Sequence, residues 1–184
     1  GSSFAFYGGT SKGVEKRTKV KTRIMASALS ELIGTAENVL IMGHQFADLD
    51  CLGSAVGMYK AVRQMGKPAA VVLNRQRNLA FPLYNRLAQN GYADAFVEPD
   101  LAIDLIGKKT LLVVVDTHLP HILESREVYS ACKTVAVIDH HRKMVGHIDN
   151  AVIFYHEPYA SSASEMVTEL VQYFGDHVKI GKME

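Results

Sequence analysis

The feature that most constrains the fold is a series of short, almost unbroken apolar segments rich in Val, Ile and Leu. They predict strands at 38–42, 69–73, 110–115, 134–138 and 151–155. Apolar residues at helical spacing predict helices at 14–33, 53–65, 79–90, 101–106 and 161–174, with an irregular helical piece at 121–129. Strands that are apolar on both faces are typical of parallel sheets covered by helices. We therefore expect an α/β fold with a mostly parallel sheet flanked by helices on both faces.

The composition argues against several classes of binding partner and site. With 184 residues, 48% of them hydrophobic, the chain can bury one sizeable core. A net charge of +1 and a mean hydropathy of +0.03 lack the signature of a protein that binds duplex nucleic acid or a membrane. Cys51 and Cys132 form no CxxC pair, which argues against a disulfide framework or a thiolate zinc site. We expect a cytoplasmic domain without direct membrane contact.

Acidic and imidazole side chains follow three of the predicted strands. The first strand leads into His44, Asp48 and Asp50, the third ends in Asp116, and the fourth ends in the triplet Asp139-His140-His141. Ligands of such sheets bind outside the carboxyl ends of the strands, so we expect these side chains to converge at one edge. Each motif alone is weak evidence for a ligand site, because an Asp at a strand end is often a helix N-cap and a single His is often a core residue.

Several carboxylates at one edge need a positive charge to offset their repulsion. Carboxylate and imidazole ligands without thiolates favour Mn²⁺ or Mg²⁺, with zinc or iron as alternatives. A carboxylate shared by two ions is the usual centre of a two-metal hydrolase, in which a metal-activated water attacks a phosphoester. The sequence therefore predicts a metal-dependent phosphoesterase.

The motif order resembles a known family. His44-x-x-x-Asp48-x-Asp50-x-x-Gly53-Ser54, then Val-Val-Asp116, then Asp139-His140-His141 resemble motifs one to three of the DHH phosphoesterases. Further stretches resemble the GdpP type of cyclic di-AMP phosphodiesterase, namely Phe6-Tyr7-Gly8-Gly9, Val115-Asp116-Thr117-His118 and Glu157-Pro158-Tyr159-Ala160-Ser161-Ser162. The resemblance covers essentially the whole chain. It implies the remnant of a degenerate GGDEF domain and a linker at 1–17, and a DHH domain at 18–184 that ends before the fourth motif.

The resemblance also implies roles for the site residues. A first Mn²⁺ would be held by His44, Asp48 and Asp116, and a second by Asp50, Asp116 and His140, with Mg²⁺ or another divalent ion as an alternative. Asp139 would orient its neighbours and His141 would contact phosphate. Substrate contacts are expected at Gly53, Ser54, His141, Arg142, Ser161 and Ser162. For the two serines of the last helix the alternative is N-capping, and for Arg142 it is a solvated loop.

The implied activity is hydrolysis of cyclic di-AMP to linear pApA by a hydroxide that two metal ions activate. The parent protein is expected to be a homodimer anchored in the bacterial membrane, and the isolated segment is expected to be weak or inactive. Two alternatives stay open, a nanoRNA or mononucleotide phosphatase of the same superfamily and a non-catalytic metal- or nucleotide-binding module. His118 and His121 are expected to be surface loop histidines, with proximity to the active site as the alternative, more so for His118. Cys51 is expected to be a buried small residue, with an influence on the site through oxidation as the alternative.

Overall fold

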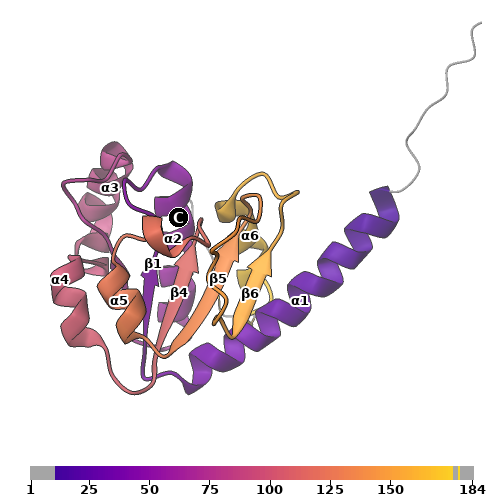
Figure 1. Cartoon of the computed structure of the whole chain (residues 1–184), viewed down its shortest axis with the longest axis horizontal. Helices are drawn as coiled ribbons and strands as arrows, with labels where there is room; N and C mark the ends of the chain where they lie inside the picture. Colours follow the sequence, from indigo (N-terminus) through magenta and orange to yellow (C-terminus); the bar gives the residue numbers. More distant parts are fainter. Residues whose placement is uncertain (1–10, 176–177, 179–184) are drawn as a thin grey trace, which may run out of the picture.

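A six-stranded sheet forms the centre of the computed structural model, which describes residues 11–175 and residue 178, with side chains from residue 19 onward. Its strand order is β3-β2-β1-β4-β5-β6 and all the pairings are parallel (Figure 1). The strands are β1 Asn38–Met42, β2 Ala69–Val72, β3 Phe96–Val97, β4 Thr110–Val115, β5 Thr134–Asp139 and β6 Ile153–His156. The expected α/β class is confirmed. Sequence reasoning missed β3, because its two residues are too few to show a pattern.

Helices connect these strands. The α-helices are α1 Ser11–Thr35, α2 Leu49–Gln64, α3 Phe81–Leu87, α4 Pro99–Ala102, α5 Arg126–Ala131 and α6 Ala163–Val171. Shorter helical turns are η1 Ala88–Tyr92, η2 Ala93–Ala95, η3 Ile103–Leu105 and η4 Pro120–Ile122. The helix expected at 79–90 is shorter because the backbone leaves the helical region at Asn90 and Gly91. None of the helices in this part of the chain is long and apolar enough to cross a membrane.

Helices cover both faces of the sheet, as expected. On one face, alternate strand residues pack with α1, α2 and α6, and this larger core includes Leu29, Val56 and Val167. On the other face, the remaining strand residues pack with α4 and α5 through Ala102 and Val128. Alternate residues of each strand enter opposite cores, which is why the strands are apolar throughout.

The strand order reverses between β1 and β4. The chain proceeds outward from β1 through β2 to β3, and then outward in the other direction from β4 through β5 to β6. In open α/β sheets this reversal leaves a crevice outside the carboxyl ends of the two central strands. Residues that follow β1 and β4 are therefore brought to the same place. Residues 1–10, which hold most of the proposed GGDEF remnant and the motif Phe6-Tyr7-Gly8-Gly9, lie outside the described residues.

Gly43, at the end of β1, is packed closely against α2. A Cβ atom at this position would lie 2.1 Å from Sγ of Cys51 and 3.2 Å from the carbonyl oxygen of Val115. We expect Gly43→Ala to lower the free energy of unfolding by about 1–3 kcal/mol, the usual cost of overpacking a core. Urea unfolding measures this change.

Gly34→Ala is the matched control, because an added Cβ there has no neighbour within 4 Å among the described atoms. In a helix such as α1, Ala is favoured over Gly by up to about 1 kcal/mol, so this variant should be as stable as the wild type or more so. Combining Gly43→Ala with Cys51→Ala removes the nearest atom and should recover part of the loss. A Gly43→Ala protein with unchanged stability would show that the close packing is wrong.

Candidate metal centre

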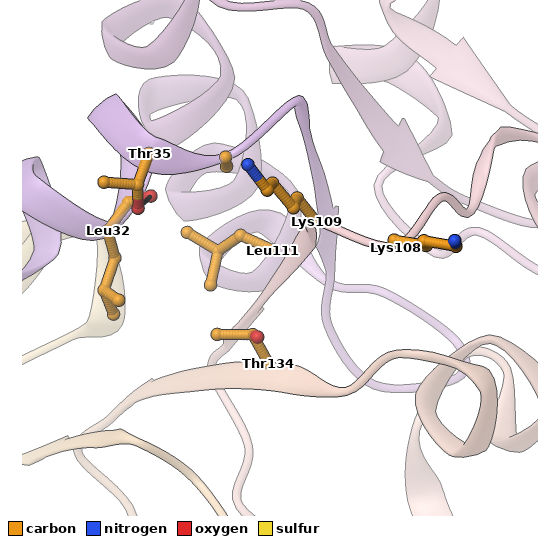
Figure 2. Close-up of a pocket in the computed structure, with 7 residues that line it drawn as sticks. Leu32, Thr35, Lys108, Lys109, Leu111 and Thr134 are labelled. Atoms are coloured by element: carbon orange, nitrogen blue, oxygen red, sulfur yellow. Dashed lines mark hydrogen bonds between the residues drawn. The ribbon is translucent and has the colours of Figure 1, made fainter.

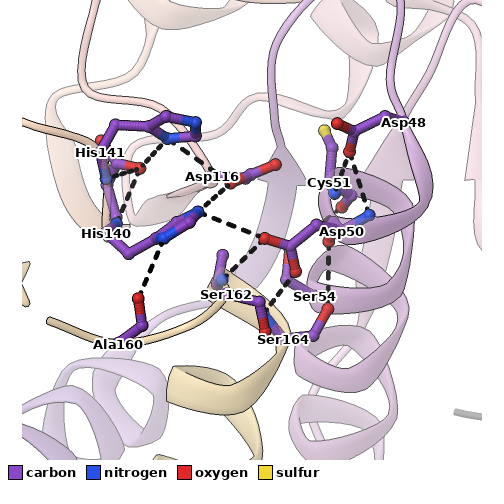
Figure 3. A network of polar contacts seen from close by, with 12 residues as sticks. Asp48, Asp50, Cys51, Ser54, Asp116, His140, His141, Ala160, Ser162 and Ser164 are labelled. Atoms are coloured by element: carbon purple, nitrogen blue, oxygen red, sulfur yellow. Dashed lines mark hydrogen bonds and ion pairs between the residues drawn. The ribbon is translucent and has the colours of Figure 1, made fainter. Parts of the chain in front are cut away.

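Asp116 lies at the middle of the cluster of acidic and imidazole side chains (Figure 3). It follows β4 directly, is only 2% exposed, and has a φ of 58°, a left-handed backbone conformation that costs energy for most residues but that Asp tolerates. Its Oδ2 lies 3.4 Å from Nε2 of His44, and its Oδ1 lies 3.5 Å from Nε2 of His140 and 3.7 Å from Nδ1 of His141. One buried carboxylate therefore faces histidines from two different loops.

The loop after β1 supplies His44 and Asp48. Nδ1 of His44 lies 2.8 Å from the carbonyl oxygen of Gln45, which leaves Nε2 facing Asp116. Asp48 is the N-cap of α2, and its Oδ1 accepts hydrogen bonds from the amides of Asp50 and Cys51, each at 3.0 Å. The same Oδ1 lies 4.0 Å from Nε2 of His44. Asp48 therefore begins the helix and borders the cluster at once.

Asp50 joins α2 to the start of α6. Its Oδ2 accepts from the amide of Ala163 and its Oδ1 from the amide of Ser164, each at 2.8 Å, and Oδ2 also lies 3.5 Å from Nε2 of His140. Burial alone would raise the pKa of the Asp50 carboxyl, but the hydrogen bonds from Ser164 and Ala163 and the charge of His140 outweigh it and lower the pKa. Asp50 is thus held as a carboxylate beside His140.

Asp139 lies behind the cluster and supports its two neighbours. The carboxylate is fully buried, and its Oδ1 accepts from the amides of His140 and His141, at 2.9 and 3.2 Å, and from Nδ1 of His141, at 2.8 Å. Its Oδ2 accepts a hydrogen bond from His118. His141 is half exposed; burial would lower its pKa, but Asp139 and Asp116 raise it more. The triplet therefore combines a buried support with two imidazoles that lie beside Asp116.

Two of the expected substrate contacts lie inside α2 rather than at its start. α2 begins at Leu49, so Gly53 and Ser54 lie in its second turn, where the amide groups bond within the helix and are not free for an anion. Ser54 is also completely buried, and its hydroxyl donates to the carbonyl oxygen of Cys51 at 3.1 Å. The helix begins earlier than expected because Asp48 caps it.

The other expected substrate contacts lie at the rim of the cluster. Ser162 caps α6 by accepting from the amide of Glu165 at 3.0 Å, and the hydroxyl of Ser161 donates to the Glu165 carboxylate. Ser162 therefore has the capping role that was its alternative, whereas Ser161 precedes the cap and binds the side chain of Glu165. Arg142 is exposed directly after the triplet. Their contact with a substrate stays a prediction.

Sequence reasoning missed the position of His118, which is 1% exposed rather than on the surface. Cys51, expected to be buried, also has its Sγ near the ligand atoms of His44 and Asp116. Burial raises the pKa of the Cys51 thiol, which disfavours the thiolate that a metal would need. The sequence signal for His118 was its place two residues after Asp116, which by itself does not distinguish a loop residue from a buried one.

The cluster fits divalent metal ions. Oδ1 of Asp116 is buried without a hydrogen-bond partner among the residues that the structure describes, and burial raises the pKa of this carboxyl in spite of the nearby His44. The structure contains two sets of possible ligand atoms, and within each set all the atoms lie within 4.8 Å of one another. One set comes from His44, Cys51 and Asp116, and the other from Asp116, His140 and His141. Buried carboxylates are normally paired or bound to metal. A cation between the imidazoles would satisfy the orphaned oxygen.

The hydrogen bond to Asp116, followed by the contact with Cys51, raises the pKa of His44 to about 11, although burial acts in the opposite direction. A metal ligand must be a neutral imidazole, so a metal ion has to displace a proton from His44. We expect metal affinity to rise about tenfold per pH unit near neutrality and about one proton to be released at this residue. Titration calorimetry in buffers of different ionisation enthalpy measures the released protons.

His44→Asn is the control, because it removes the titrating group and should abolish the proton release at this position. In the metal-free protein, the raised pKa makes the stability of the fold decrease with pH, whereas the metal affinity increases with pH. His44 contributes stability that is fully present below its ordinary pKa of 6.5 and is lost as the pH rises through about 11. Metal affinity that is the same at pH values on either side of neutrality would contradict the assignment of His44 as a ligand.

A surface pocket of about 290 Å³ lies at the amino ends of β4 and β5 (Figure 2). Its lining includes the end of α1 and the starts of β4 and β5, through Leu32, Thr35, Lys108, Lys109, Leu111 and Thr134. The amino ends of the strands are therefore on this side and the acidic cluster is on the other. The pocket does not belong to the candidate metal centre.

Comparisons with known proteins show the family to which the chain belongs. Residues 38–183 match the DHH family, N-terminal domain. The chain is 41% identical over 183 residues to "Cyclic-di-AMP phosphodiesterase GdpP" of Geobacillus thermodenitrificans, and 37% identical over 184 residues to "Cyclic-di-AMP phosphodiesterase PdeA" of Listeria monocytogenes. Each alignment covers 97% of this chain and 28% of the relative, so the chain spans little more than a quarter of their length.

Solved structures share the fold. An exopolyphosphatase-related protein from Bacteroides fragilis has a TM-score of 0.69 at 20% identity, over 85% of this chain and 46% of that one. The exonuclease RecJ bound to manganese has a TM-score of 0.50 at 14% identity, over 83% of this chain and 37% of that one. At these identities the likeness concerns the fold alone.

Proposed function

The chain belongs to the DHH family, and from this premise we propose that it forms the metal centre of a phosphodiesterase that hydrolyses cyclic di-AMP to linear pApA. The observation that carries the proposal is the buried Asp116, whose two oxygens face His44 and His140 at 3.4 and 3.5 Å. The choice of substrate rests on relatives that are 36–41% identical to the chain over 182–184 aligned residues and are named cyclic-di-AMP phosphodiesterases.

Two divalent ions, Mn²⁺ by preference, would share Asp116 as a bridging ligand. His44 and Asp48 would complete the protein ligands of one ion, and Asp50 and His140 those of the other. Bound there, the ions supply Lewis-acid polarisation of the phosphoryl oxygens and a water of lowered pKa as the nucleophile. Asp50 is prepared for this role because the amides of Ala163 and Ser164 hold its carboxylate in place.

His141 is the proposed phosphate contact. Its Nδ1 is held by Asp139, so Nε2 is the nitrogen left for a phosphoryl oxygen. Asp139 and Asp116 raise the pKa of His141 against the effect of burial, which favours a positively charged imidazole beside an anionic substrate. The exposed Arg142 next to it would add a further charge, and Ser161 and Ser162 are the remaining candidates for substrate contact.

The longer protein is proposed to contain the GGDEF remnant and linker at 1–17 and the DHH domain from 18 onward. A homodimer anchored in the bacterial membrane, with this domain on the cytoplasmic side, is proposed for it as well. Support for membrane anchoring comes from a more distant relative, 28% identical over 185 residues and named a fusion of a membrane protein with a ribosomal subunit. Dimer formation rests on the family resemblance.

The test is a substrate comparison on the full-length protein with Mn²⁺. We expect cyclic di-AMP to be converted to pApA, separated by chromatography, with pApA and pyrophosphate turned over far more slowly. Faster hydrolysis of pApA would favour the nanoRNA or mononucleotide phosphatase. Tight Mn²⁺ binding without hydrolysis of any of the three compounds would favour a non-catalytic binding module.

A further inference from the structure

His118 is a buried histidine outside the expected ligand set, and both of its ring nitrogens are engaged. Nε2 accepts a hydrogen bond from the amide of Met144 at 3.1 Å. A backbone amide can only donate, so Nε2 carries no proton and Nδ1 is the protonated nitrogen. Nδ1 accordingly donates to Oδ2 of Asp139. His118 is therefore held as a neutral imidazole with a defined tautomer.

The partner of His118 is the carboxylate that organises the catalytic triplet. Oδ1 of Asp139 is occupied by three donors, the amides of His140 and His141 and Nδ1 of His141. For Oδ2, His118 is the partner that the structure provides. Because Asp139 is fully buried, an oxygen without a donor would carry the full cost of desolvation and the carboxylate would rotate to recover a partner.

His118 also connects three segments that meet behind the metal centre. It lies two residues after Asp116, it binds Asp139 at the end of β5, and its carbonyl oxygen accepts from the amide of Ile148 at 2.8 Å. Rings of His147, Phe154 and His156 surround it, with centroids 5.8–6.4 Å away. These rings fix the imidazole by packing, and its hydrogen bond fixes the direction in which Asp139 points.

We propose that His118 is a positioning residue that acts through Asp139 to hold the backbone of His140 and His141 and the hydrogen bond from Nδ1–H of His141 to Asp139. The inference deepens the proposed function, on which its catalytic part rests. Its consequence is that Nε2 of His141 and Nε2 of His140 are presented to the crevice in a single arrangement. Ligands of metal centres are commonly held by such supporting hydrogen bonds, which cost 10- to 100-fold in activity when they are removed.

The test compares His118→Asn with His118→Leu. The side-chain amide of Asn places an N–H close to where Nδ1 of His lies, so it retains the donor to Asp139, whereas Leu removes it. Both variants lose the acceptor for the Met144 amide, and His118→Leu also leaves Oδ2 of Asp139 without its donor, so His118→Leu should be the less stable of the two in urea unfolding. In the full-length protein with Mn²⁺, we expect kcat to fall about 10- to 100-fold in His118→Leu with little change in KM, and about threefold or less in His118→Asn. His121→Leu, an exposed histidine nearby, is the control and should leave kcat unchanged.

A second measurement does not depend on activity. Long-range ¹H–¹⁵N correlation spectra of the metal-free chain, recorded at a pH high enough for a neutral imidazole, report which nitrogen of His141 carries the proton. We expect the Nδ1–H form in the wild type and in His118→Asn, and a mixture of tautomers in His118→Leu. Equal loss of kcat in both variants, or an unchanged His141 tautomer in His118→Leu, would overturn the proposal. If the wild type does not hydrolyse cyclic di-AMP, the proposed function fails, while the tautomer comparison still decides the role of His118.

Discussion

Asp116→Asn is expected to lower kcat for cyclic di-AMP by at least about a thousandfold, equivalent to about 4 kcal/mol of activation free energy. The physical reason is that one buried carboxylate faces His44 through Oδ2 and His140 through Oδ1, so both proposed metal sites depend on it. An amide is a weaker ligand than a carboxylate and cannot bridge two cations with a negative charge. The measurement is steady-state hydrolysis in the full-length protein with Mn²⁺.

The same substitution should leave the metal-free fold largely intact. Asn tolerates the positive φ of 58° at this position as well as Asp does, and it has nearly the same shape. The amide loses the charged hydrogen bond with His44, so we expect the free energy of unfolding without metal to fall by about 1.5–3 kcal/mol, while the stabilisation that Mn²⁺ adds to the wild type disappears. Asp104→Asn, which changes an exposed acid in η3, is the control and should keep both activity and metal stabilisation. Normal Mn²⁺ stabilisation in Asp116→Asn would rule out the bridging role.

Asp139→Ala is expected to lower the free energy of unfolding by about 3–5 kcal/mol, the cost of breaking a buried, fully paired charge. The variant leaves the buried donor of His118 and the partly buried donors of His140 and His141 without their acceptor. For a chain of this size, that loss corresponds to a decrease in Tm of about 10 °C. Thermal and urea unfolding of the metal-free protein measure it, so the result does not depend on the proposed activity.

Asp104→Ala again provides the matched control, because it removes the same carboxyl from an exposed site and should change stability by about 0.5 kcal/mol or less. Asp139→Asn should fall between the two, since its amide oxygen can still accept from part of the donor set. A Tm of Asp139→Ala equal to that of the wild type would mean that the four hydrogen bonds are not formed in solution.

Short-range sequence signals predicted the sheet and most of the site. Val, Ile and Leu without polar alternation indicate strands buried on both faces, and this pattern needs no knowledge of contacts far along the chain. The carboxyl ends of parallel strands share one edge of a sheet, so the positions of His44, Asp116 and His140 after their strands were enough to predict that they lie near one another. The shortness of β3 and the early start of α2 were missed, because two residues show no period and because Asp48 could be either a cap or a ligand.

The sequence by itself determined the class of fold, the strand ends that carry the acidic and imidazole residues, and the chemistry that such residues favour. Only the tertiary structure decided that Asp50 is held by the amides of Ala163 and Ser164, more than a hundred residues away, and that Ser54 is buried. It also decided that His118 is buried and hydrogen-bonded to Asp139 rather than on the surface. The physical reason is that burial and hydrogen-bond partners depend on which distant segments the fold brings together. The periodicity of strands and helices, in contrast, depends on residues that are close in sequence.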